Sequence, residues 1–212
     1  MGSTVLPYLN PTQAYVALTM LTAVLMMRRT KKNFILLAIL SICLLNEILS
    51  LVFLMNGLTI VLLITITSTV HNCAWLLLLY EVIRRKTLRW LLAVYISLAI
   101  ANMLFIDGVA SFNYNTFILG AFLYLLYFIY ESFYRLRAED FTFFTDNDYT
   151  LLSAPVLFFI GLSFIFGFKS IVLSKTPVIS NMNLYNVIGI FVNFIYYLLI
   201  NMYLFKQRKS NA

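Results

Sequence analysis

The sequence predicts an all-α integral membrane protein, a bundle of seven transmembrane helices with its N-terminus outside and its C-terminus in the cytoplasm. Three observations predict it. Of the 212 residues, 62% are hydrophobic and only 11% are charged, whereas soluble domains carry about 25% charged residues. Seven apolar runs each have nearly the length of about 20 residues that a helix needs to cross the hydrocarbon core of a bilayer. Lys and Arg cluster between alternate runs, as they do in the cytoplasmic loops of membrane proteins.

The predicted spans follow one another with short connections. A short extracytoplasmic segment, 1–10, precedes them and a basic cytoplasmic tail, 206–212, follows them. Asn56-Gly57 and Asp107-Gly108 are turn signals after the second and fourth spans, and Pro155 predicts an irregular turn near the start of the sixth. The seven spans cover 11–27, 33–56, 58–81, 87–106, 116–134, 149–172 and 184–205.

The basic residues predict the orientation of the bundle. With seven spans, all but two of the 15 Lys and Arg residues fall on one side, and that side is cytoplasmic by the positive-inside rule. The exceptions are Lys169 and Lys175. A six-span arrangement, in which the short first run does not insert, would leave the first basic cluster without a defined side. The main topology determinants are Arg28, Arg29, Lys31, Lys32, Arg84, Arg85, Lys86 and Arg89.

The second and third spans each carry an ionisable residue near the middle, Glu47 and His71. Such residues are costly in a bilayer and normally face the bundle interior or a wet cavity. Because the two spans form a tight antiparallel hairpin, Glu47 and His71 are expected at similar depth. They are candidates for a site that binds a ligand or moves a proton. The alternative is a hydrogen bond between helices that only fixes their packing.

Five further polar residues join Glu47 and His71 as candidates for this ligand or proton site. Asn46 and Asn72 neighbour the two ionisable residues, Asn102 lies in the fourth span, and Asn193 and Tyr197 lie one turn apart in the seventh. Amide side chains in membrane helices more often join helices than bind ligands. Packing is therefore the alternative interpretation for each of them.

Two acidic residues near the basic side precede an arginine by four positions, Glu81 before Arg85 and Glu131 before Arg135. Residues four apart face each other on a helix. We therefore expect two ion pairs exposed to solvent.

Missing motifs exclude several functions. A single histidine in the chain excludes zinc and di-iron sites with several His ligands, and there is no cysteine cluster. The seventh span has no lysine for a retinal Schiff base. No nucleophile elbow or phosphate-binding glycine loop is present. The sequence therefore predicts no metal, no cofactor and no catalytic residue, and it weighs against an enzyme. Since orientation explains the basic clusters, the predicted partner is membrane lipid and not nucleic acid.

Three motifs carry a resemblance: Asn46-Glu47 in the second span, Tyr80-Glu81 at the end of the third, and Asn102-Met103-Leu104-Phe105 at the end of the fourth. In these the chain resembles a group of small bacterial seven-span membrane proteins. The resemblance implies a sensory or accessory protein of bacterial signalling in the inner membrane, and it brings no catalytic residues.

Two functional hypotheses follow. The first is a sensory or signalling-accessory protein that acts through a membrane or cytoplasmic signalling partner, contacted by 135–148 or by the C-terminal tail. The alternative is a small transporter or channel with Glu47 and His71 along its pathway. The transport hypothesis requires a cavity that reaches Glu47.

Overall fold

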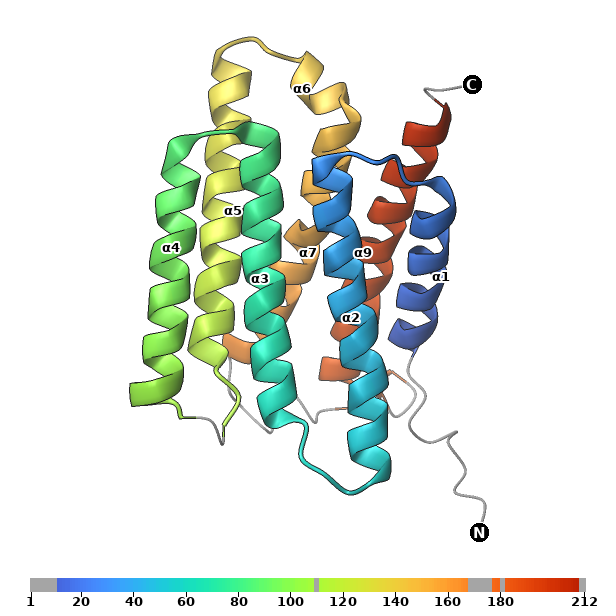
Figure 1. Cartoon of the computed structure of the whole chain (residues 1–212), viewed down its shortest axis with the longest axis vertical. Helices are drawn as coiled ribbons and strands as arrows, with labels where there is room; N and C mark the ends of the chain where they lie inside the picture. The colour runs from blue at the N-terminus through green and yellow to red at the C-terminus, as the bar shows by residue number, and fades with distance from the viewer. Residues whose placement is uncertain (1–10, 109–110, 168–176, 180–181, 210–212) are drawn as a thin grey trace.

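The structure, a computed structural model, describes residues 11–108, 111–167, 177–179 and 182–209. It is an all-α bundle with one small antiparallel hairpin of two strands (Figure 1). The helices are α1 (Pro11–Met26), α2 (Lys31–Met55), α3 (Val61–Ile83), α4 (Lys86–Ala101), the π-helix η2 (Asn102–Ile106), α5 (Tyr114–Arg137), α6 (Thr142–Thr145), α7 (Asn147–Gly167) and α9 (Leu184–Lys209), and the strands are β1 (Pro177–Ile179) and β2 (Met182–Asn183).

The helices confirm an all-α bundle of apolar helices. Within the described residues, six helical segments are long and apolar enough to cross a membrane, with η2 counted as the end of the α4 segment, and α1 is apolar but shorter. This indicates a membrane protein. The predicted segments 1–10 and 168–172 lie outside the described residues. The predicted tail at 206–209 is instead the last turn of α9, where its basic side chains interact favourably with the negative end of the helix dipole.

Local sequence explains where several helices begin and end. The Thr30 hydroxyl caps α2 by accepting a hydrogen bond from the backbone N–H of Asn33. Gly57 and Gly108 adopt φ values of +69° and +73°, a left-handed conformation that glycine tolerates, so both predicted turns are confirmed. Arg84 ends α3 with φ at +59°.

Pro155 lies within α7 and does not end it. A proline removes one backbone hydrogen bond from the preceding turn. The Tyr124 hydroxyl donates a 2.7 Å hydrogen bond to the Leu152 carbonyl in that turn. A neighbouring helix therefore supplies a polar contact where α7 is weakened, as is common for proline in membrane helices.

Six helices form a closed ring in the order α1, α2, α3, α5, α7 and α9, each packed against the next and α9 packed against α1. Helix α4 stands outside this ring and packs against α3 and α5 (Figure 1). The ring explains why the fully buried side chains Trp75, Tyr124 and Tyr196 come from three different helices and contact one another at its centre.

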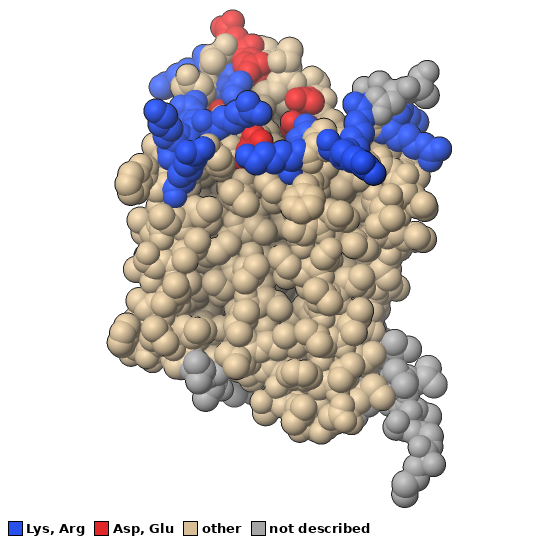
Figure 2. Space-filling view, in the orientation of Figure 1, with Lys and Arg blue, Asp and Glu red and all other residues tan. Residues whose placement is uncertain are grey.

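The two ends of the bundle differ in charge (Figure 2). We call the end that carries Arg28, Lys32, Arg84 and Lys206 the basic end, and the other end, with Gly57 and Gly108, the opposite end. All Lys and Arg residues of the described part lie at the basic end. Lys169 and Lys175 lie outside the described residues.

The prediction of two solvent-exposed ion pairs at the basic end is partly wrong. Glu131 does pair with Arg135, over 2.8 Å, but its side chain is only 1% exposed and also contacts Arg85 over 3.0 Å. Glu81 pairs with Lys31 instead of Arg85. The reason is where α3 ends. Arg84 ends the helix in a left-handed conformation, so Arg85 no longer lies on the helix face that carries Glu81.

Candidate ligand-binding cavity

A cavity of about 680 Å³ lies inside the helix ring, within the range of small-molecule sites. Its lining comes from the halves of α2, α3, α7 and α9 that lie toward the opposite end, with the first residues of α1 and the N-terminal part of α5. The cavity therefore occupies one half of the bundle only. Its polar lining residues are Thr12, Cys43, Asn46, Glu47, Thr67, Ser68, His71, Tyr185, Asn186, Asn193, Tyr196 and Tyr197.

Glu47 lies on the α2 wall of the cavity, within hydrogen-bonding reach of the Gln13 side chain of α1. Its neighbour Asn46 accepts a 2.8 Å hydrogen bond from the Thr67 hydroxyl of α3. This bond places Asn46 level with Thr67, so Glu47 lies one residue toward the opposite end and His71 one turn toward the basic end. The two residues therefore differ in depth by about 8 Å, which confirms the predicted similarity to between one and two helical turns.

His71 and Tyr196 form the deep end of the cavity, and Trp75 contacts both of them. The Trp75 indole N–H donates to His71 Nε2 over 3.2 Å and to the Tyr196 hydroxyl over 3.1 Å, and that hydroxyl lies 3.1 Å from Nε2. Because an indole nitrogen only donates, Nε2 is the acceptor and the imidazole proton is on Nδ1. The neutral ring is thus oriented by its two neighbours.

Glu47 and His71 line the same cavity but are not hydrogen-bonded to each other. Glu47 lies within hydrogen-bonding reach of Gln13, and the hydrogen bonds of His71 involve Trp75 and Tyr196. The suggested direct pair is therefore absent from the described contacts. A molecule between the two residues would contact both.

Asn193 and Tyr197 also line the cavity, on α9. The side-chain amide nitrogen of Asn193 donates to the Gly189 carbonyl of its own helix over 2.8 Å. This bond does not use the amide oxygen, which can accept hydrogen bonds from other groups. Tyr197 lies within hydrogen-bonding reach of the Cys43 thiol across the cavity. The α9 wall therefore presents polar groups opposite the α2 wall.

Asn72 and Asn102 do not line the cavity. The Asn72 amide donates to the Tyr95 hydroxyl and the Phe117 carbonyl, each over 3.2 Å. The Asn102 amide donates to Asp107 and to Thr116, each over 2.8 Å. These two residues join α3, α4 and α5, so the packing interpretation holds for them.

Aromatic rings cover much of the cavity wall in two groups. Near the opposite end, the Phe166 ring packs against Phe112 at 5.2 Å and Phe117 at 5.1 Å between centroids. At the deep end, Phe158 packs against His71 at 5.5 Å and Tyr196 at 5.0 Å. Glu47 lies on the α2 wall of the same cavity.

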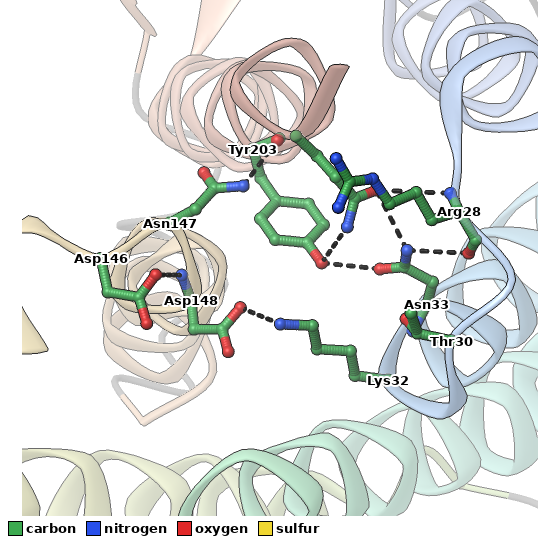
Figure 3. Close-up of polar contacts among 9 residues, drawn as sticks. Arg28, Thr30, Lys32, Asn33, Asp146, Asn147, Asp148 and Tyr203 are labelled. Atoms are coloured by element: carbon green, nitrogen blue, oxygen red, sulfur yellow. Dashed lines mark hydrogen bonds and ion pairs between the residues drawn. The ribbon is translucent and has the colours of Figure 1, made fainter. Parts of the chain in front are cut away.

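Toward the basic end, the interior is filled by side chains and closed by a buried polar network (Figure 3). The Tyr203 hydroxyl donates to the Asn33 amide oxygen over 2.6 Å, and the Asn33 amide donates to Gln207 over 3.0 Å. Gln207 in turn donates to the Tyr203 hydroxyl over 3.2 Å, and Asn147 donates to the Tyr203 carbonyl over 2.9 Å. Asn33 and Tyr203 are fully buried. The network joins α2, α7 and α9 on the side away from the cavity.

Sequence reasoning found five of the cavity residues, Asn46, Glu47, His71, Asn193 and Tyr197, and missed the partners that orient the ionisable ones. A signal for Trp75 was present, since it follows His71 by four residues on one helix face. Comparison of the chain with protein-family models, curated proteins and solved structures gave no match.

Proposed function

We propose that the protein crosses the membrane seven times and binds a small molecule in the cavity, as a sensory or signalling-accessory protein that acts through a partner. In this proposal the basic end is cytoplasmic, because Lys and Arg favour that side, and the cavity extends from the outer side. The motif resemblance supports the inner membrane of a bacterium as its location.

The observation that carries this proposal is the one-sidedness of the cavity. It reaches His71 from the opposite end, while the Asn33–Tyr203–Gln207 network fills the interior at the basic end. A site that must report a molecule outside the cell needs access from that side only.

Helix α9 supplies a route from the cavity to the basic end. Tyr196, Ile200, Tyr203 and Gln207 are spaced along one face, and all four are buried. Tyr196 contacts His71 at the deep end of the cavity, and Tyr203 and Gln207 belong to the buried network. A ligand that shifts Tyr196 would change the position of the whole of α9. A rigid helix with two alternative positions is an element that can couple two sites.

The proposal sends the output to a partner at the basic end. The described connections there are short, and the longest, 138–146, holds only the four-residue helix α6. A signal would leave the membrane domain through contacts of this connection or of the last turn of α9.

Crosslinking tests this proposal. A photo-crosslinker at Glu139, which is exposed in the 138–146 connection, is used to capture partners in native membranes. Ser68→Phe fills the cavity from α3, and Ser97→Phe on the exposed face of α4 is the matched control. We expect Ser68→Phe to change the yield of a specific crosslinked partner and Ser97→Phe to leave it unchanged. Equal yields in both variants would contradict the proposal.

Cysteine labelling tests the orientation. Both native cysteines are replaced by alanine, and one cysteine is placed at Gly57 or at Glu139. An impermeant maleimide added to intact cells should label position 57 and not position 139. The reverse pattern would contradict the proposed orientation.

A transporter or channel is the second candidate, and the cavity that reaches Glu47 favours it. Transport would require the network at the basic end to open. A solute or proton flux in proteoliposomes that disappears in Glu47→Gln, with partner crosslinks unchanged, would favour transport over sensing.

A further inference from the structure

We infer that the cavity binds a monovalent organic cation, an amine or quaternary ammonium with an apolar body. This inference rests on the proposed function, because it names the ligand class of the same cavity. It is carried by the charge of the lining and by the aromatic rings that share the cavity with Glu47.

Among the described residues, the lining carries one carboxyl group, and its one basic side chain is the imidazole of His71. Glu47 is its only carboxyl group, and no Lys or Arg of the described part lines it. The described partner of Glu47 is the neutral Gln13 amide. A carboxyl group held among apolar helices needs a proton or a cation to compensate it. A cationic ligand supplies that compensation, whereas an anion would be repelled.

The aromatic groups favour an organic cation over a metal ion. Seven Phe and Tyr rings line the cavity, and the faces of such rings attract ammonium groups and also pack against an apolar body. The described residues contain no group of three or more His, Cys, Asp or Glu that would hold a metal ion. One carboxylate matches one positive charge.

Neutral polar groups elsewhere on the lining also suit an amine. The amide oxygen of Asn193 and the hydroxyl of Ser68 lie on the lining, and both accept hydrogen bonds. The neutral His71 ring adds no positive charge at the deep end. The volume of about 680 Å³ accommodates a body larger than a simple ammonium ion.

Cys43 provides a native reporter of this selectivity. It lines the cavity one turn deeper than Glu47, while Cys73 is not part of the lining. Methanethiosulfonate reagents convert its thiolate to a mixed disulfide and release methanesulfinate. In a Cys73→Ser background we compare a trimethylammonium-ethyl, a sulfonatoethyl and an uncharged methyl reagent. We divide the ratio of the first two labelling rates at Cys43 by the ratio of the same two rates with 2-mercaptoethanol. This normalised ratio no longer depends on the intrinsic reactivity of the reagents or on the ionised fraction of the thiol.

We expect this normalised ratio to favour the cationic reagent by roughly tenfold or more, because a unit charge passes within about 6 Å of Glu47 at an intermediate effective dielectric. Glu47→Gln should return the ratio to about one, and Glu81→Gln at the basic end should leave it unchanged. An unselective or anion-selective ratio in the native cavity would overturn the ligand class alone. If none of the three reagents labels Cys43 even at alkaline pH, where more of the thiol is ionised, the cavity is inaccessible and the proposed function fails with it. Cys43→Ala verifies that labelling occurs at this residue.

Discussion

The Tyr203 hydroxyl donates a 2.6 Å hydrogen bond to the Asn33 amide oxygen, joining helices from opposite ends of the chain. Both side chains are fully buried. This bond belongs to the network that fills the interior of the ring at the basic end. The cavity therefore lies only in the half of the bundle toward the opposite end. The Tyr203–Asn33 bond is also a contact between polar residues that sequence patterns did not single out.

Tyr203→Phe should lower the free energy of unfolding by about 1–3 kcal/mol, because it leaves the Asn33 oxygen buried without its donor. The midpoint of thermal unfolding in detergent measures this loss. Tyr130→Phe is the matched control, since the Tyr130 side chain is 51% exposed. Equal midpoints for the two variants would show that the network contributes nothing to stability.

Glu131→Gln should destabilise the basic end, because Arg85 and Arg135 both lose their buried counter-charge. Removing one partner of a fully buried ion pair costs about 3–5 kcal/mol. Both arginines are about one third exposed, so we expect roughly half of that after solvent screening. Denaturant unfolding compares it with Glu139→Gln, whose side chain is exposed. A midpoint equal to that of the control would contradict the buried role of Glu131.

Gly120→Ala should destabilise the contact between α3, α4 and α5. An added Cβ would lie 2.5 Å from the Asn72 amide nitrogen and 2.7 Å from the Tyr95 hydroxyl, and both side chains are buried. Such overpacking typically costs about 1–3 kcal/mol. Gly189→Ala is the opposite case, with nothing within 4 Å of its Cβ, so better helix propensity should make it neutral or stabilising. Thermal midpoints that move in the same direction would contradict this packing.

Trp90 should be the tryptophan that contacts lipid. Its side chain is 76% exposed on α4, whereas Trp75 is fully buried at the ring centre. In vesicles of brominated lipid we expect Trp90→Phe to lose most of the fluorescence quenching and Trp75→Phe to retain it. Stronger quenching of Trp75 than of Trp90 would contradict the placement of α4 outside the ring.

The helices and the charge asymmetry of the two ends could be predicted from the amino-acid sequence. Hydrophobic runs need no tertiary information, because their length is set by the lipid they must cross. The turns at Gly57 and Gly108 were equally predictable, since a left-handed backbone favours glycine. Glu47 and His71 stood out because a bilayer penalises them wherever the helices pack.

Which polar residues share the cavity depends on the tertiary structure. Asn46, Asn72, Asn102 and Asn193 have the same chemistry, but the rotation of α2 and α9 directs Asn46 and Asn193 into the cavity, whereas Asn72 and Asn102 join α3, α4 and α5. The tertiary structure also decided that His71 bonds with Tyr196, which is 125 positions away in the chain. Residue spacing fixes the faces of one helix, but the neighbour that each face meets depends on how all the helices pack together.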